Sequence, residues 1–449
     1  MATTAILPPD SETARDLVDP REQLLHAPMS PFQIAAVAIT LLLCMLDGFD
    51  VLTISFAAPA ILREWGIDKA QLGFALSAGL LGMALGALTI APLGDIIGRR
   101  KVLFLSLAMM IGGSLWTAAT IGLPGLVASR VITGLGIGAM IGVLYPLAAE
   151  YANARRRDLA ISVLSLGYPI GGILGGLLSS YLLATHGWRA IFVFAAGMGV
   201  VLAGLVWFVL IEPLALVVAR PGKNGLHRAN AYLARCGHGP VAVLPPPPAN
   251  RRIPIASLFA PDMARATLTI TAIYFLYMVP QFFMQAWLPT LVADLGLPPA
   301  KGALVAAFFS MGGVAAALFI GTMSLRIGIK RLEIGLLIGA AVAIAGFAAL
   351  PGVMHTLIGG AVVSGFFVMG GMIGLYAIIA RTFPAHLRAS GTGFVVGLGR
   401  LGSILPPMIA GTLSKGGMGR EELAILMAAP AIIAMIALLT FKVRAPTTA

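Results

Sequence analysis

Two acidic residues lie three positions apart inside an otherwise apolar stretch of the chain. Asp47 and Asp50 fall within residues 32–60, a run long enough to cross a lipid bilayer. A charged carboxylate at membrane depth costs several kcal/mol unless it is protonated, paired or hydrated, so it commonly marks an ion or substrate pathway. Their spacing places both acids on one face of a helix, where mutual repulsion favours protonation of at least one. The pair is a candidate proton carrier; the alternative is that one acid only caps a helix break at Gly48.

An arginine in a second apolar stretch, residues 124–150, is the first candidate partner of these acids. At 1.5 Å per residue, Asp47 lies about 23 Å and Arg130 about 9 Å from the starts of their helices, which enter from opposite sides. Both therefore reach the outer half of a ~30 Å hydrocarbon core. We expect Arg130 to bridge to Asp47 or Asp50 and to keep that acid ionised until a proton or substrate arrives. A permanent structural salt bridge is the alternative.

A second intramembrane arginine, Arg400, lies about 11 residues into the apolar stretch 389–413, or ~16 Å deep. We find no acid in the carboxy-terminal apolar stretches that could pair with it. The sequence therefore predicts that its guanidinium binds the carboxylate of a substrate through two parallel hydrogen bonds. A structural arginine satisfied by carbonyl groups at helix ends is the alternative.

Four polar and aromatic side chains recur on one helical face of residues 264–292: Tyr274, Tyr277, Gln281 and Gln285. A cavity with aromatic walls and amide donors suits a flat, carboxylated ligand. Three further aromatic residues are candidates for the same cavity: Phe49, Tyr145 and Tyr376. The two tyrosines could equally serve in helix packing.

A loop of acidic, basic and glycine residues follows the apolar stretch 71–91. Its glycines permit a tight turn, and its acid and arginines can form a cytoplasmic latch that breaks during a conformational change. Glu150 lies about 30 Å along its helix from Arg130, on roughly the opposite face, so we assign it to this gate. The candidate gate residues are Asp95, Gly98, Arg99, Arg100, Glu150 and Arg388.

The elements that must position these residues are membrane-spanning helices. Of the 449 residues, 59% are hydrophobic and only 11% are charged, which excludes a soluble globular protein. The sequence predicts an all-α polytopic membrane protein. Twelve apolar stretches are long enough to span a bilayer: 32–60, 71–91, 102–120, 124–150, 159–184, 189–211, 264–292, 302–324, 333–350, 356–380, 389–413 and 422–441.

The net charge of +12 reflects membrane topology rather than nucleic-acid binding. Most basic residues fall in alternate short loops, which predicts that both termini are cytoplasmic. The two cysteines, Cys44 and Cys236, are expected to be too far apart to form a disulfide. All six histidines lie outside the predicted spans, so we expect no metal site within the membrane.

The chain matches itself at an offset of 230 residues, as in the pairs Pro59 with Pro289 and Gly82 with Gly312. Two six-helix halves related by an axis along the membrane normal follow from this repeat, with a substrate site between them. We therefore divide the chain into a cytoplasmic arm (1–31), an amino-terminal bundle (32–211), a partly disordered cytoplasmic linker (212–263), a carboxy-terminal bundle (264–441) and a cytoplasmic tail (442–449).

Two motifs resemble those of the major facilitator superfamily. Residues 93–101, Leu-Gly-Asp-Ile-Ile-Gly-Arg-Arg-Lys, resemble its loop signature G-x-L-x-D-R-x-G-R-R, although Ala91 replaces the first glycine and Ile96 an arginine. The second copy carries Leu325 in place of the acid, so the latch is expected to be asymmetric. Residues 130–138, from Arg130 to Gly138, resemble the R-x-x-x-G-x-G-x-x pattern associated with proton coupling. The resemblance implies two pseudo-symmetric six-helix bundles.

The run Asp47-Gly48-Phe49-Asp50 matches the D-G-x-D motif of the aromatic acid:proton symporter branch of this superfamily. The resemblance implies import of hydroxybenzoate-, protocatechuate- or vanillate-like acids together with protons. Residues 167–172 are one residue short of the antiporter signature G-P-x-x-G-G, which also favours import.

We therefore expect a proton-coupled importer of an aromatic carboxylate that works by alternating access, as a monomer in a bacterial inner membrane. The alternatives are a symporter of sugar acids or other aliphatic anions and, less favoured, a drug efflux antiporter. The proton is the only coupling ion expected, without another cofactor. The sequence contains neither a P-loop nor an H-E-x-x-H motif, which argues against ATP-driven transport and against a metalloprotease.

Overall fold

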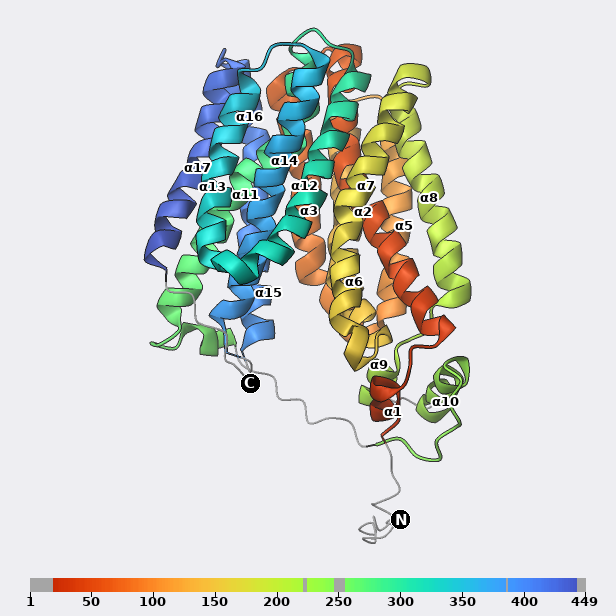
Figure 1. Ribbon diagram of the computed structural model, residues 1–449. Helices are drawn as coiled ribbons and strands as arrows, with labels where there is room; N and C mark the ends of the chain where they lie inside the picture. The colour runs from red at the N-terminus through yellow and green to blue at the C-terminus, as the bar shows by residue number, and fades with distance from the viewer. Residues whose placement is uncertain (1–18, 221–223, 246–254, 385–386, 442–449) are drawn as a thin grey trace.

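The computed structural model describes residues 19–220, 224–245, 255–384 and 387–441. Within these residues the chain is helical, without a β-strand, and twelve helical segments are long and apolar enough to cross a membrane. The predicted all-α polytopic fold is confirmed. Figure 1 shows two groups of helices side by side, α2 to α8 in one half and α11 to α17 in the other.

Each half contributes six of these segments. Those of the amino-terminal half are α2 (Pro31–Trp65), α3 (Lys69–Thr89), α5 (Arg99–Ala119), α6 (Leu123–Tyr151), α7 (Arg157–Thr185) and α8 (Trp188–Val209). Those of the carboxy-terminal half are α11 (Ala264–Ala293), α12 (Pro299–Ile327), α13 (Ile329–Ala348), α14 (Met354–Thr382), the interrupted segment α15 (Arg388–Gly399) to α16 (Leu405–Lys415), and α17 (Arg420–Thr440). The helix ends differ from the predicted spans by a few residues, which brings His355 into the first turn of α14.

The eleventh span is broken at Arg400. Between α15 and α16 the chain forms a short 3-10 helix, η4 (Arg400–Ser403). Glycines before the break have low helix propensity, and Pro406 and Pro407 at the start of α16 lack the N–H groups that would continue the preceding helix. The break places Arg400 at a helix end inside the bundle.

The first helical hairpin is fixed by local capping. Ser30 and Gln33 form a capping box at the start of α2, and α2 ends at Gly66, whose φ of 60° is left-handed. Asp68 and Gln71 form a second capping box that starts α3. The turn between the first two spans is therefore specified by its own residues.

Glycines allow the closest helix contacts in each half. A Cβ on Gly82 or Gly86 of α3 would collide with the backbone of α6, and one on Gly138 of α6 would collide with the carbonyl of Met83. In the other half, Gly312 of α12 meets the backbone of α14 in the same way. Equivalent contacts at matched repeat positions, Gly82 and Gly312, are consistent with two similar halves.

The segment between the halves contains two short helices, α9 (Leu214–Ala219) and α10 (Gly225–Arg235), which lie with α1 (Pro20–His26) at one end of the bundle (Figure 1). We call this end the linker side and the opposite end the far side. The Tyr151 hydroxyl donates to the Ile211 carbonyl, and the rings of Tyr151 and Tyr232 stack 6.2 Å apart. This part of the linker is folded against the amino-terminal half, where its apolar side chains are buried. Residues 246–248 of the proline run lie outside the described residues.

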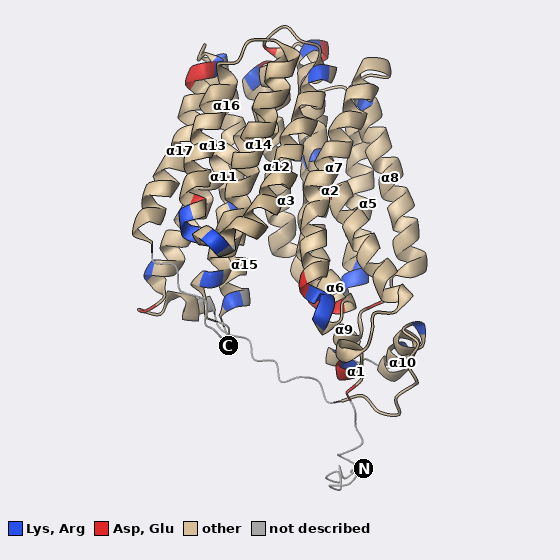
Figure 2. Cartoon of the chain, viewed as in Figure 1, with Lys and Arg blue, Asp and Glu red and all other residues tan. Residues whose placement is uncertain are grey.

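Figure 2 shows that the charged residues of the described chain gather at the two ends of the bundle. The few charged side chains at membrane depth are therefore the exceptions that a functional site must explain.

Candidate functional site

Asp47 and Asp50 are both buried in the middle of α2, each only 1% exposed. The helix runs through Gly48 without a break, so the helix-capping alternative is wrong. Gly48 is instead needed for packing, since a Cβ there would collide with the backbone of Tyr168 on α7. The acids are fixed on a continuous helix rather than on a flexible hinge.

Arg130 of α6 lies beside Asp50 but does not form the expected salt bridge. Its Nη2 donates to the Asp50 backbone carbonyl at 3.3 Å, and no ion pair to a carboxylate within 4.0 Å is present in the described chain. Nε and Nη1 of Arg130, and Oδ1 of Asp50, are buried without a hydrogen-bond partner there. The two side chains still interact electrostatically, and the guanidinium lies 5.9 Å from the ring of Phe192. The pair is close enough to tighten after a small shift of either helix.

Asp47 has a different partner, Arg400, from the other half. An electrostatic interaction joins the two side chains, although the carboxylate Oδ1 has no hydrogen-bond partner in the described residues. The sequence left open which acid faces Arg130 and predicted no acid partner for Arg400. In the structure Asp50 faces Arg130 within one half, and Asp47 faces Arg400 across the two halves. Sequence could not make this division, because both acids share a helix face.

Four tyrosines of the described chain interact with Arg400: Tyr145, Tyr168, Tyr274 and Tyr376. The hydroxyl of Tyr274 on α11 donates to that of Tyr376 on α14 at 3.0 Å, with ring centroids 5.7 Å apart, and both phenols make polar interactions with Arg400. Tyr145 of α6 interacts electrostatically with Arg400 and Tyr376 from the opposite half. Tyr274 also packs on Gly399, where a Cβ would collide with its ring. A cationic group framed by aromatic rings results.

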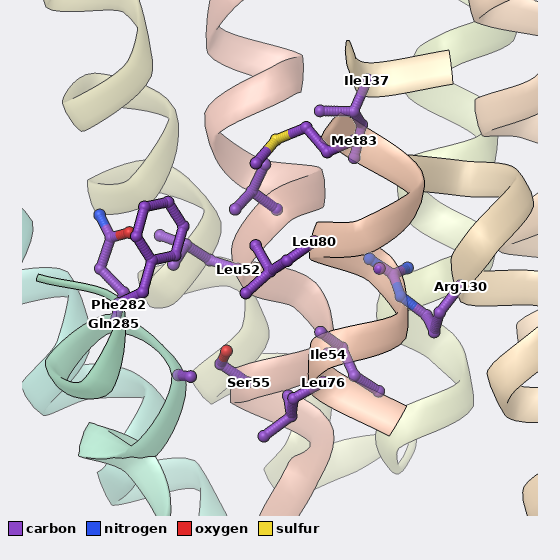
Figure 3. Close-up of a pocket in the computed structure, with 13 residues that line it drawn as sticks. Leu52, Ile54, Ser55, Leu76, Leu80, Met83, Arg130, Ile137, Phe282 and Gln285 are labelled. Carbon is purple, nitrogen blue, oxygen red and sulfur yellow. The ribbon is translucent and has the colours of Figure 1, made fainter. Parts of the chain in front are cut away.

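This cluster is partly accessible, whereas the space beyond it is closed. Tyr145, Tyr376 and Arg400 are at least partly exposed although they face one another across the halves. Toward the far side, a cavity lined by residues of α2, α3, α6 and α11 has about 30 Å³ of space, enough for about one or two water molecules and no organic acid. Figure 3 shows Arg130 on one wall of this cavity and Phe282 and Gln285 on the other.

Not all members of the predicted cavity stripe point the same way. Gln285 lines the cavity and makes a polar interaction with Tyr168 of α7. Gln281 is fully buried, and its amide atoms have no partner in the described residues. The Tyr277 hydroxyl donates to the Val368 carbonyl of α14 at 2.7 Å, so this residue lies inside the carboxy-terminal half instead of in the cavity. The face of α11 that carries these four residues therefore contacts more than one neighbouring helix, α14 at Tyr277 and α7 at Gln285.

Phe49 is also directed away from the cavity. Its ring lies 6.4 Å from that of Phe194 on α8 and packs on Gly175 of α7. It follows Gly48 by one residue and therefore falls on a different face of α2 from the two acids.

The candidate gate residues cluster at the linker side. Arg99 forms ion pairs with Glu150 at 2.8 Å and with Asp95 at 3.3 Å, and Gly98 provides the turn before α5 with a φ of 112°. Arg100 donates to the Trp207 carbonyl at 2.7 Å. All these contacts lie within the amino-terminal half, while Arg388 is exposed at the start of α15 in the other. The latch residues are gathered as expected, but they do not join the two halves here.

Sequence analysis missed one member of this cluster. Glu212, after the end of α8, accepts hydrogen bonds from the backbone N–H groups of Arg99 at 2.6 Å and Arg100 at 3.4 Å. A carboxylate at this position accepts hydrogen bonds from otherwise unpaired N–H groups in the first turn of α5. Its negative charge also interacts favourably with the partial positive charge at the N-terminus of that helix. The Ile-Glu-Pro sequence at residues 211–213, directly after a span, was the available signal.

The buried acid Glu333 was also missed. It is the fifth residue of α13 and is 0% exposed. The statement that the carboxy-terminal stretches contain no acid is therefore wrong, because Glu333, the first residue of the predicted span 333–350, lies inside α13.

On the far side the two halves are tied together. Lys69 pairs with Asp294 at 2.8 Å and Lys415 pairs with Asp68 at 2.8 Å, each pair crossing between halves. Deeper in, the Ser77 hydroxyl donates to the Ile404 carbonyl at 2.7 Å. No hydrogen bond or ion pair of the described residues joins the halves at the linker side. The polar contacts that tie the two halves of the described chain together are therefore concentrated on the far side.

Comparison with known proteins points to one family. The chain matches the model of the Major Facilitator Superfamily over residues 40–278 and 270–449. It is 30% identical to a gallate transporter of Pseudomonas putida, covering 94% of each chain, and 32% identical to a 4-hydroxybenzoate transporter of Pseudomonas aeruginosa, covering 92% of this chain and 93% of that protein. The inward-open xylose transporter of E. coli has a similar fold, with a TM-score of 0.70 at 16% identity over 93% of this chain and 98% of that one.

Proposed function

The chain belongs to the Major Facilitator Superfamily, and we propose that this transporter, which is not an enzyme, imports an aromatic carboxylate together with protons. The observation that carries the proposal is the approach of Asp47 and Arg400 across the two halves, beside the phenols of Tyr274 and Tyr376. An acid that can take a proton and a cation that can hold an anion therefore interact electrostatically across the halves.

The pairing gives a direct exchange mechanism. With Asp47 ionised, its charge is balanced by Arg400; a proton on Asp47 leaves the guanidinium free for a substrate carboxylate. The net charge of the site is unchanged when one proton and one carboxylate enter together, so neither is favoured at membrane depth without the other. In this scheme Asp50 and Arg130 form a second pair that responds to the same change.

The surroundings favour an aromatic acid over an aliphatic one. Aromatic rings stack and pack edge to face at low conformational cost, and Tyr274, Tyr376 and Tyr145 provide such faces around Arg400. Phenol hydroxyls can also bond the ring hydroxyls of a hydroxybenzoate. The names of the related gallate and 4-hydroxybenzoate transporters support the same substrate class.

We assign the linker side to the cytoplasm, because the basic loops at residues 99–101, 155–157 and 326–331 lie on this side. We take the membrane to be the bacterial inner membrane. The far side, tied by the ion pairs of Lys69 and Lys415, then faces outward. On this assignment the structure represents the inward-facing state, from which substrate is released, and rocking of the halves would expose the site outward.

Transport into proteoliposomes tests the proposal. With an inward-directed proton gradient, purified wild-type protein should accumulate labelled 4-hydroxybenzoate, and collapse of the gradient with a protonophore should abolish accumulation. Excess benzoate-type acids should compete, whereas gluconate should not. Competition by gluconate alone would favour an aliphatic anion instead.

Asp47→Asn isolates the coupling role. We expect this variant to lose gradient-driven accumulation by at least tenfold, because its site can no longer release or take a proton. Asp262→Asn, at an exposed loop position, is the matched control and should transport like the wild type. Unchanged accumulation by Asp47→Asn would refute the coupling mechanism.

A further inference from the structure

Glu333 is a buried carboxyl group that the proposed transport cycle does not use. It is 0% exposed, and neither carboxyl oxygen has a hydrogen-bond partner in the described residues. Lys330, one turn earlier on α13, is directed elsewhere, with its Nζ donating to the carbonyls of Leu439 at 2.9 Å and Phe441 at 2.7 Å. Arg331 is exposed. The nearest basic residues on its own helix therefore leave Glu333 uncompensated.

The helices packed around Glu333 do not compensate it either. On α14, Gly374 faces the Glu333 carboxyl group, and a Cβ at this position would overlap the carboxyl oxygen Oε2. On α11, Tyr277 interacts with Glu333 electrostatically, but its hydroxyl donates to Val368.

The remaining charged groups of the packed helices lie near helix ends. On α14, Arg381 lies two turns beyond Gly374, near the end of the helix. Arg265 of α11 and Arg326 of α12 are exposed at the linker-side ends of their helices. The other charged residues lie at the far side: Lys301 of α12, and Arg420, Glu421 and Glu422 in the first turn of α17. No ion pair to Glu333 is present in the described chain.

A charged carboxylate in such a site would be deprived of water, hydrogen bonds and counter-charge together. A neutral carboxyl group avoids most of this cost. We propose that Glu333 is a second proton-binding site, in the carboxy-terminal half, which is occupied in this conformation. The proton adds to one carboxylate oxygen and returns to water when the group is exposed. The inference deepens the proposed function and rests on its proton coupling.

The location of Glu333 indicates which side exchanges the proton. It lies four residues after the first residue of α13, or about 6 Å from the linker-side end of that helix. Water from the linker side therefore has the shorter path. Movement of α14, which covers the carboxyl with Gly374, is the simplest way to open it.

Contiguous contacts connect this site to the proposed substrate site formed by Tyr274, Tyr376 and Arg400, which we call the substrate cluster. Gly374 precedes Tyr376 by two residues on α14, and Tyr376 contacts Tyr274 and Arg400. On the same helix, Gly371 packs against the Tyr277 ring. A shift of α14 that opened Glu333 would therefore also move a wall of the substrate cluster, which links release of the proton to occupancy of that cluster.

Infrared difference spectroscopy of the purified protein tests the site directly. Adding 4-hydroxybenzoate should change a band of a protonated carboxyl group that is absent from Glu333→Gln. The same band should persist in Asp47→Asn and in the exposed control Glu421→Gln. Spectra of Glu333→Gln identical to those of the wild type would overturn the proposal.

Transport provides a second readout that a purely structural role would not produce. Glu333→Gln should retain exchange of labelled for unlabelled substrate within about twofold, but lose gradient-driven accumulation by at least fivefold. Equal loss of both activities would indicate a structural role and would overturn the proposal. Glu333→Asp, which keeps the titrating group, should recover accumulation.

The two proposals fail in different ways. If wild-type protein did not accumulate acid under a proton gradient but the Glu333 band responded to substrate, the proposed symport would fail and the proton site would stand. If accumulation required Asp47 but Glu333→Gln behaved as the wild type in both experiments, only the second proton site would fail.

Discussion

At the scale of single residues, the site depends on which charge faces which. Asp47 and Asp50 share one face of α2, yet only Asp47 approaches Arg400, while Asp50 approaches Arg130. The acids differ because Arg130 comes from α6, which packs on α2 within the same half, whereas Arg400 comes from the break between α15 and α16 in the other half. A proton on either acid therefore frees a different arginine.

Replacing Arg400 by lysine tests its role in holding a carboxylate. Arg400→Lys keeps the positive charge but removes the planar pair of donors. Hydrogen bonds to a charged group are worth about 1.5–3 kcal/mol, so the Kd of 4-hydroxybenzoate should rise by about 10- to 100-fold. Isothermal titration calorimetry at fixed pH measures the change.

The matched control for this substitution is Arg331→Lys, at an exposed position of α13. It should leave the Kd unchanged. An Arg400→Lys protein that bound the acid as tightly as the wild type would show that the guanidinium is structural.

At the scale of helices, contacts at glycines hold the helices within each half close together. Gly138 of α6 lies against the carbonyl of Met83 on α3, and Gly82 of α3 lies against the backbone of Val131. These reciprocal contacts hold α6, which carries Arg130, closely against α3, and α6 also packs on α2. Small residues are the usual means of close approach between membrane helices, where lipid provides little hydrophobic driving force.

Adding one methyl group at this contact should be destabilising. Gly138→Ala would force α3 and α6 apart, an overpacking cost of about 1–3 kcal/mol. Its melting temperature in detergent should fall by several degrees. Gly197→Ala, in α8 with open space around it, should keep or slightly raise the melting temperature, since alanine is the better helix former. Equal effects of the two substitutions would contradict the packing argument.

At the scale of the whole molecule, the conformation is set by the contacts between halves. These contacts include two ion pairs on the far side, Lys69 with Asp294 and Lys415 with Asp68. Exposed ion pairs contribute little individually, about 0–1 kcal/mol. They can nevertheless shift an equilibrium between two conformations that differ by only a few kcal/mol.

Exchange of charges across one pair provides a test. Lys69→Asp alone places two acids opposite each other and should increase the population open on the far side. The double variant Lys69→Asp with Asp294→Lys should restore the wild-type population. Distances between spin labels attached to the far-side ends of the two halves report the populations. Failure of the double variant to restore them would argue against the ion pair as a latch.

The second pair should respond to pH. A hydrogen bond from the Lys415 side chain, followed by one from the backbone N–H of Gln71, lowers the pKa of Asp68 below its ordinary value. Because the pKa of Asp68 is lowered in the closed structure, the pair stabilises the closed conformation fully above the ordinary aspartate pKa, near pH 4. This stabilisation is lost as the pH falls through the lowered pKa of Asp68. The same spin-label distances should therefore shift toward the open population only at acidic pH, and Lys415→Met should weaken this dependence.

Much of this protein follows from local sequence. Apolar runs of sufficient length specify the twelve spans, because each backbone polar group must be satisfied within a helix in the membrane. The cost of charge in lipid identifies Asp47, Asp50, Arg130 and Arg400 as exceptions. Capping residues such as Ser30 and Gly66 fix turns that depend only on their immediate neighbours.

Only the tertiary structure decides the pairing and the conformation. Helical periodicity places a residue on a face, but which neighbour meets that face depends on packing between distant segments. Hence Tyr277 bonds to α14 instead of facing the cavity, and Asp47 meets Arg400. The burial of Glu333 and the far-side pair of Lys69 with Asp294 join or enclose groups separated by long stretches of chain, and no local pattern encodes such contacts.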